Sequence, residues 1–415
     1  MKKQSAIPAT HEVGVLSAMK SVTAPKGFSA AGVSCGVKAK GKDLAIIYSD
    51  VPATAAAVFT RNKVKAAPVL ISEKHILDGR IQAIVVNSGI ANCCTGEQGL
   101  KDATRMAELT AVELNIPKTS VLVASTGKIC PLLPMEKIEP GIKEAAANLS
   151  KNGGGDAAQA IMTTDTRAKE AALELELFGG KVTLGGIAKG AGMIHPGLAT
   201  MLAFITTDAL ISPSLLKKAL LHSVGRSFNM ITVDGVMSTN DMVAILANGL
   251  ASEQGEEITY PGKEFDLFQA ALDELSIDLA KQIPADGEGA TKLLEVRVRG
   301  ALIEEDARQF AWAVAGSNLV KAAFYGGDPN LGRIMAALGQ AGQEMNPETV
   351  DVYFSDQLML RNSQEVAFDP AKVASIMAQR EIKIEIDLNL GQAKATAWGC
   401  DLSPEYVRIN AHYRT

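Results

Sequence analysis

The stretch AKGAGMIHPGLATMLAFITTDA, residues 188–209, joins a glycine-rich loop to an apolar run with the composition of a buried strand. Pro196 and Gly197 make the loop irregular, because proline fixes its own backbone and glycine permits conformations closed to other residues. Thr200 is the last residue before the run MLAFI begins. The stretch therefore predicts a strand that starts beside a threonine held by an irregular loop.

A threonine in this position has two interpretations. The ordinary one is a residue that enters a strand, where threonine is favoured. The other is a nucleophile, since a weakly nucleophilic hydroxyl becomes reactive when a base lies beside it, and the residue's own α-amine can be that base. An α-amino group titrates at about pH 8, so part of it is neutral at the pH of the cytosol. Spacing alone favours the ordinary interpretation and leaves the second open.

The second interpretation requires a cut in the chain directly before Thr200, because the α-amine is otherwise part of a peptide bond. Ala199 offers an unhindered carbonyl carbon at this point, and the irregular loop before it allows a strained peptide. The hydroxyl of Thr200 could itself attack such a peptide. The residues thus suit an autocatalytic cut between Ala199 and Thr200.

The composition is that of a folded α/β protein that handles small molecules. The chain has 415 residues, of which 47% are hydrophobic and 21% charged, and this length allows two or three domains. Its net charge of -5 gives no basic surface for nucleic acid or an anionic membrane. We find no apolar run of the kind that a secretory signal or a membrane span needs, so we expect a cytoplasmic protein.

This sequence contains no complete version of the familiar cofactor-binding and metal-binding motifs. Residues 36–42 match GxxxxGK, but Asp43 stands where a phosphate loop needs a hydroxyl. The five histidines are scattered and show no HxxxH spacing. The five cysteines form an odd set without CxxC spacing, which favours reduced thiols over disulfides or zinc. We expect neither a metal nor a cofactor.

Strand-like and helix-like segments alternate along the chain, which indicates α/β architecture. After the helical pattern of residues 263–283 the order of elements changes, and we place a domain boundary near residue 285. Beyond it we expect a smaller α+β domain with one strand, two helices and further strands. Ser212 is expected to cap a helix that has Pro213 at its first position. The expected strands are 43–50, 55–62, 81–89, 121–126, 293–303, 349–360 and 383–390, and the expected helices 97–114, 212–224 and 263–283.

Eight motifs in a fixed order resemble those of one known family. The order of the motifs is similar to that in the glutamate N-acetyltransferase / ornithine acetyltransferase enzymes of arginine biosynthesis, and the resemblance covers essentially the whole chain. The motifs are NSGIANCCTGEQG (87–99), VASTGKI (123–129), AIMTTDT (160–166), KGAGMIHPGLATML (189–202), SFNMITVDGVMSTND (227–241), DGEGATKLLEV (286–296), DPNLGRIMAALG (328–339) and YVRINAHYRT (406–415).

The resemblance implies a self-cleaving enzyme. The precursor would be cut between Ala199 and Thr200 into an α chain, residues 1–199, and a β chain that starts with the nucleophile Thr200, and two of each chain would associate. Thr200 would take the acetyl group from N-acetylornithine and pass it to glutamate without a cofactor. The implied fold is an αββα-layered, N-terminal-nucleophile-like catalytic domain over residues 1–285, followed by a smaller α+β domain over 286–415 whose tail returns to the active site.

The resemblance also assigns site residues. Thr126 and Gly127 match the family's oxyanion-hole pair, in which a hydroxyl and a backbone N–H stabilise the tetrahedral intermediate. Lys189 would suit the substrates' carboxylates, and Glu288 the side-chain ammonium of ornithine. The positions that match the family's substrate-binding residues are Thr163, Lys189, Thr200, Glu288, Asn410 and Thr415.

Two other functions use the same residues. A self-cleaving aminopeptidase or amidase would admit water to the acyl-enzyme, and a non-enzymatic amino-acid-binding regulator would keep the pocket without the chemistry. The sequence does not decide whether acetyl-CoA is a second donor. It departs from the family pattern at Ile90, Cys93, Cys130, Gly197 and Leu331, none of which is an assigned site residue.

Overall fold

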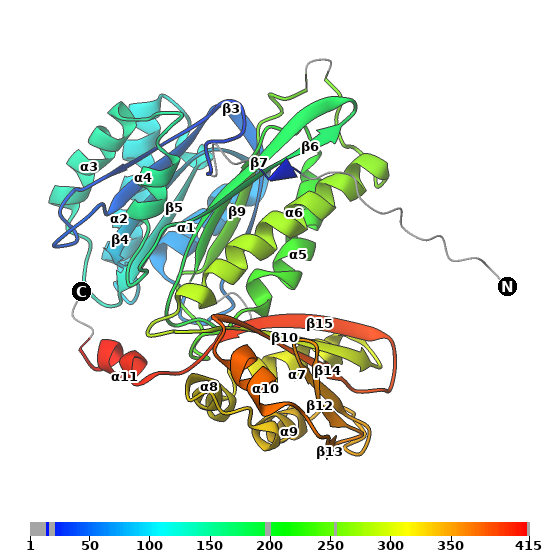
Figure 1. Ribbon diagram of the computed structural model, residues 1–415. Coiled ribbons are helices and arrows are strands. Elements are labelled where there is room, and N and C mark those ends of the chain that lie inside the picture. Colours follow the sequence, from blue (N-terminus) through cyan, green and yellow to red (C-terminus); the bar gives the residue numbers. More distant parts are fainter. Residues whose placement is uncertain (1–13, 16–20, 196–200, 253–254, 413–415) are drawn as a thin grey trace.

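The computed structural model describes residues 14–15, 21–195, 201–252 and 255–412. Its two sheets lie one above the other in Figure 1, with the larger one formed by the first part of the chain. Among the described residues, no helix has the length and apolar character needed to cross a membrane.

The larger sheet has nine strands in the order β1-β6-β7-β8-β9-β3-β4-β5, and β2 also pairs with β3. β8 and β9 are parallel, as are β4 and β5, and the other pairs are antiparallel. The strands are β1 (Gly14–Val15), β2 (Phe28–Val33), β3 (Leu44–Phe59), β4 (Arg80–Ile90), β5 (Val121–Lys128), β6 (Lys169–Leu177), β7 (Gly180–Lys189), β8 (Leu202–Thr207) and β9 (Met242–Ala247).

The long strand β3 divides this sheet into two leaves. Residues 44–49 of β3 pair with β2, and residues 54–59 pair with β9, with a register irregularity between Tyr48 and Ala53. We call β2, β4, β5 and the first half of β3 the first leaf, and β1, β6 to β9 and the second half of β3 the second leaf. Apolar side chains from both leaves meet in one buried cluster, so the leaves pack face to face.

Strands buried on both faces explain the apolar runs in the sequence. In β9, Met242, Ala244 and Leu246 point into the cluster between the leaves, whereas Val243 and Ile245 point to the outer core. Such alternation follows from the two-residue period of a strand, and burial on both faces requires apolar residues at every position. The apolar run that forms β9 therefore has no polar face.

Helices cover the outer face of each leaf. α1 (Ala67–His75), α2 (Gly96–Leu114) and α3 (Met135–Ala147) share a buried cluster with the first leaf, and α5 (Pro213–Arg226) and α6 (Lys263–Gln282) share one with the second. The short α4 (Gly154–Ala160) packs into the cluster between the leaves. This order of layers, visible in Figure 1, confirms the predicted αββα catalytic domain.

The second sheet is mixed and lies below the catalytic layers in Figure 1. Its order is β13-β12-β11-β14-β10-β15, in which β10 pairs parallel with β14 and antiparallel with β15. The second sheet and its helices confirm the predicted smaller α+β domain. Its elements are β10 (Leu293–Ala301), α7 (Glu304–Gly316), α8 (Asn318–Tyr325), α9 (Leu331–Gln340), β11 (Asp351–Phe354), β12 (Gln357–Arg361), β13 (Gln364–Glu365), α10 (Pro370–Met377), β14 (Glu381–Asp387), β15 (Ala393–Cys400) and α11 (Pro404–Ala411).

Several element predictions need correction. Segments 43–50 and 55–62 are not two strands but halves of the bent β3. Segment 349–360 is a hairpin rather than one strand, because Ser355, with a φ of 54°, turns the chain between β11 and β12. Three helices, not two, follow β10. The boundary near residue 285 stays a prediction, since the outer core of the second leaf continues into the second sheet.

The predicted start of α5 is confirmed, although its N-cap residue makes no capping hydrogen bond. Ser212 is the N-cap residue and Pro213 the first helical residue. The Ser212 hydroxyl makes no capping hydrogen bond, and its buried Oγ has no hydrogen-bond partner among the described residues. The helix begins where proline's fixed backbone favours it, without the usual side-chain acceptor.

Candidate active site

Six of the predicted site residues line one cavity of about 420 Å³. They come from segments far apart in the sequence, and the cavity also receives Tyr406 from α11. The predicted nucleophile Thr200, its neighbour Ala199 and the terminal Thr415 lie outside the described residues. The six residues that the fold brings together are Thr126, Gly127, Thr163, Lys189, Glu288 and Asn410.

The predicted oxyanion pair lies at the carboxyl end of β5. Thr126 is buried, and Gly127 pairs with Gly89 of the parallel strand β4. Gly127 has a φ of 129°, and a Cβ placed on it would lie 2.2 Å from the carbonyl carbon of Gly89. Only glycine fits this close approach of two backbones. The glycine of the STGK motif is thus required by strand packing, whatever its part in catalysis.

Asn240, which also lines the cavity, fixes the same end of β5. Its Nδ2 donates to the carbonyl oxygen of Ser125 at 2.8 Å and to that of Ala91 at 2.6 Å. Its Oδ1 accepts from the Thr239 hydroxyl at 2.6 Å. A buried amide with its groups satisfied in this way holds the end of β5 and the residue after β4 in one geometry. The sequence analysis did not identify Asn240 as a site residue.

Lys189, the last residue of β7, is a buried cation in the wall of the cavity. Its side chain is 2% exposed, and its Nζ lies 2.9 Å from Thr163 Oγ1 and 3.4 Å from Thr126 Oγ1. The Asp165 carboxylate lies 3.9 Å away. Burial lowers the pKa of Lys189, because a charged amine loses its hydration, and the negative charge of Asp165 opposes this effect.

Asp165 is the centre of a buried ionic cluster behind Lys189. It accepts hydrogen bonds from Lys169 Nζ at 2.7 Å, from the Gly190 amide at 2.7 Å and from the Thr163 amide at 3.0 Å. Burial acts to raise the pKa of Asp165, but the ammonium groups of Lys189 and Lys169 and these hydrogen bonds hold that pKa well below its usual range. Asp165 is therefore a carboxylate inside the protein.

Glu288 and Asn410 meet in the lining of the cavity. The Asn410 Nδ2 donates to Glu288 Oε2 at 2.7 Å, which brings the end of α11 to the site. The backbone amide of Glu288 donates to the carbonyl oxygen of Ala191 at 2.8 Å. A Cβ on Gly192 would lie 2.5 Å from the Glu288 carboxylate carbon. The second glycine of KGAG thus leaves the room that this carboxylate occupies.

Asp234 connects the C-terminal helix to the loop that precedes the predicted cleavage site. It accepts from the amides of Met193 at 2.6 Å and Ile194 at 2.9 Å, and from the Tyr406 hydroxyl at 3.1 Å. Burial raises the pKa of Tyr406, and the neighbouring Asp234 raises it further. The phenol therefore remains a hydrogen-bond donor.

Asp241 is a fully buried carboxyl group beside the start of β8. Its Oδ1 accepts from the Met201 amide at 3.0 Å, while its Oδ2 has no hydrogen-bond partner among the described residues. Burial raises the pKa of Asp241 well above its ordinary value, against the opposing effect of the Met201 N–H. Asp165, Asp234 and Asp241 all fall inside quoted motifs, and their place in these motifs was the available signal for them.

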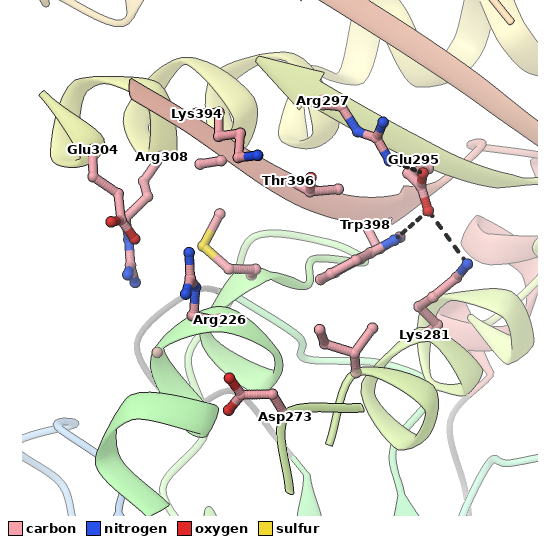
Figure 2. A pocket seen from close by; sticks show the side chains of 14 residues that line it. Arg226, Asp273, Lys281, Glu295, Arg297, Glu304, Arg308, Lys394, Thr396 and Trp398 are labelled. Atoms are coloured by element: carbon pink, nitrogen blue, oxygen red, sulfur yellow. Dashed lines mark hydrogen bonds and ion pairs between the residues drawn. The ribbon is translucent and has the colours of Figure 1, made fainter. Parts of the chain in front are cut away.

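A second cavity, of about 580 Å³, has a different character. Figure 2 shows it between α5 and α6 on one side and β10, α7 and β15 on the other. Its buried carboxylate Glu295 accepts from Trp398 Nε1 at 2.9 Å and from Lys281 Nζ at 3.3 Å. None of the six predicted site residues that the structure describes lines this cavity. In the part of the chain that the structure describes, no group of three or more His, Cys, Asp or Glu could hold a metal.

The sequence comparisons identify a family of acyltransferases. Residues 29–415 match the ArgJ family, and the chain belongs to it. It is 53% identical over 398 residues to the arginine biosynthesis bifunctional protein ArgJ of Symbiobacterium thermophilum, with 95% of this chain and 98% of that protein covered. The protein of the same name from Thermotoga neapolitana is 52% identical over 398 residues, with 94% and 99% covered.

A solved structure is also similar. The ornithine acetyltransferase of Mycobacterium tuberculosis, complexed with ornithine, is 41% identical with a TM-score of 0.42, over 46% of this chain and 100% of that chain. The family predicted from the eight motifs is thereby confirmed by the sequence comparisons. The protein is an acyltransferase that carries out acetyl transfer in arginine biosynthesis.

Proposed function

We propose that the enzyme moves the acetyl group of N-acetylornithine to glutamate through an acetyl-Thr200 intermediate, giving ornithine and N-acetylglutamate. The observation that supports this most strongly is the convergence of six predicted residues on one cavity. Glu288, at its edge with Asn410, has the charge that complements the side-chain ammonium of ornithine. The cavity thus carries groups suited to an amino-acid substrate.

The first half of the reaction forms the acetyl-enzyme. The Thr200 Oγ attacks the acetyl carbonyl carbon while its proton passes to the α-amine of Thr200. Negative charge collects on the carbonyl oxygen, where the Thr126 hydroxyl and the Gly127 N–H donate to it. The C–N bond then breaks, the amine of ornithine receives the proton, and the acetyl group stays on Thr200 as an ester.

The second half of the reaction reverses these steps with glutamate. Its amine attacks the ester carbonyl carbon and gives a proton to the α-amine of Thr200. The same two donors stabilise the oxyanion. The C–O bond of the ester breaks, the proton returns to Oγ, and N-acetylglutamate leaves. Water must be kept from the ester, because hydrolysis would release acetate.

The nucleophile requires maturation of the chain. We propose a self-cleavage between Ala199 and Thr200 into the α chain, residues 1–199, and the β chain, with two of each in the assembly, in the cytoplasm. We also propose acetyl-CoA as a second acetyl donor, since the relatives that are 53% and 52% identical to this chain are called bifunctional. All five cysteines are free thiols, in keeping with a reducing compartment.

One assay tests the function against its alternatives. The purified protein is mixed with N-acetylornithine and glutamate, and the products are separated. N-acetylglutamate and ornithine in equal amounts support the proposal. Free acetate in place of N-acetylglutamate would identify an amidase, and no product at all would favour an amino-acid-binding regulator. A parallel reaction with acetyl-CoA and glutamate tests the second donor.

The end of the chain provides a further prediction. The contact of Asn410 with Glu288 places the end of α11 at the cavity, and the predicted substrate-binding residue Thr415 follows shortly after. A tag after Thr415 should lower kcat/KM for N-acetylornithine on the order of a hundredfold, because a displacement of about 1 Å at a reacting site can cost this much.

The control is the same tag placed before Met1. Both proteins are first shown to be cleaved and to have the same melting temperature, and then their kcat/KM values are compared. Equal values would mean that the last residues are a free end, as chain termini commonly are, and that Asn410 and Thr415 were wrongly assigned.

A further inference from the structure

The ammonium group of Lys189 lies between the hydroxyls of two threonines that line the cavity. Its Nζ is 2.9 Å from Thr163 Oγ1 and 3.4 Å from Thr126 Oγ1. An ammonium has three donors and no acceptor, so each hydroxyl oxygen must accept in these contacts. The direction of both hydrogen bonds is therefore fixed by the chemistry of the partners.

This direction decides what the Thr126 hydroxyl can do. A hydroxyl that accepts from Lys189 still has its own hydrogen to donate. Among the described residues, Lys189 is the hydrogen-bond partner of Thr126 Oγ1, and the hydroxyl hydrogen has no protein acceptor. Because Thr126 lines the cavity, this hydrogen is available to a ligand there. An oxyanion at that place needs such a donor.

Asp165 holds Lys189 in this geometry. Its carboxylate is 3.9 Å from Lys189 Nζ and accepts from the amides of Gly190, the next residue along the chain, and of Thr163. The Asp165 carboxylate thus fixes the backbone of Gly190, which follows Lys189, and the backbone of Thr163. Asp165 also supplies the negative charge that a buried ammonium requires.

We propose that Lys189, held by Asp165, is a positioning residue of the oxyanion hole: it directs the Thr126 hydroxyl to donate toward the reacting carbonyl oxygen. This differs from the binding of a substrate carboxylate by Lys189, because two threonine hydroxyls and Asp165 already surround its ammonium. The assignment rests on the proposed acetyl transfer and adds to it the means by which one donor is oriented.

The test is a double-mutant cycle of Lys189→Met and Thr126→Ala, read as kcat and KM for N-acetylornithine. Lys189→Met should lower kcat by about ten- to a hundredfold and change KM by less than about threefold, since the oriented donor acts mainly on the transition state. In the Thr126→Ala background the same change should lower kcat by less than about threefold. Residues that act through one another are non-additive in such cycles.

Three further variants complete the design. Asp165→Asn should show the same pattern more weakly, and Lys189→Arg should recover part of kcat because it retains the charge. The matched control is Lys38→Met, which removes another partly buried lysine near Asp165 whose Nζ donates to the Met162 carbonyl oxygen instead of a threonine. Its effect should be multiplicative with that of Thr126→Ala.

The possible results separate the two roles. A large rise in KM for Lys189→Met, with effects that multiply with those of Thr126→Ala, would overturn the proposal in favour of carboxylate binding. If Lys189→Met slows maturation, the rate of precursor cleavage replaces kcat as the quantity measured in the double-mutant cycle, because cleavage also involves attack on a carbonyl, that of Ala199. In that case kcat is measured for Asp165→Asn. Failure of the wild type to transfer acetyl at all would instead contradict the proposed function.

Discussion

The Thr200→Ala protein is expected to run as one full-length chain in denaturing electrophoresis and to transfer no acetyl group, whereas the wild type runs as two fragments. The second fragment of the wild type should begin Thr-Met-Leu-Ala in N-terminal sequencing. Both effects have one cause, because the Thr200 hydroxyl is proposed to attack first the Ala199 carbonyl and later the acetyl group, with its own α-amine as base after the cut.

Thr200→Ser is the matched control for this experiment. Serine retains the hydroxyl and, after cleavage, the α-amine, so this variant should still mature and retain measurable transfer. Loss of cleavage in both variants would point to a general disturbance of the loop. A wild-type protein that stays uncut while fully active would refute the mechanism based on an N-terminal amine, although acetyl transfer itself would stand.

The Thr126→Ala protein should have the second-largest loss. Deleting one oxyanion donor typically costs about 3 kcal/mol, so we expect kcat to fall roughly a hundredfold or more while KM for N-acetylornithine changes little. The fold should survive, because the Gly127 backbone remains paired with β4 and Asn240 still holds the end of β5. Steady-state kinetics on the cleaved protein measures both constants.

Thr164→Ala is a suitable comparison for Thr126→Ala. Thr164 also lines the cavity, so it reports the general effect of removing a threonine there, and we expect its kcat to fall by much less. An unchanged kcat for Thr126→Ala would exclude its hydroxyl from the reaction and would also remove the basis for the role of Lys189. The other donor, the Gly127 N–H, has no side chain to delete.

The amino-acid sequence determined the alternation of strands and helices, and the resemblance of its motifs to one family implied the αββα layers and the site residues. Apolar runs such as MLAFI indicated strands, and burial of β8 and β9 between two cores explains why these runs have no polar face. Thr126, Gly127, Lys189 and Glu288 belong to motifs whose order marks the family, so they were predicted as site residues before any geometry was known. Local patterns sufficed here because strand burial and motif identity are properties of short segments.

Contacts between distant segments were decided by the tertiary structure alone. Residue spacing cannot show that Lys189 reaches Thr126, 63 residues away, or that Asn410 reaches Glu288, 122 residues away. The bend of β3 was likewise missed, because a strand that passes from one leaf to the other has the same local pattern as two short strands. Asp165 and Asp241 look like surface residues in the sequence. In the folded chain both carboxyls are buried, which acts to raise their pKa values. Two ammonium groups beside Asp165 reverse this effect and lower its pKa, whereas burial dominates at Asp241 and raises its pKa.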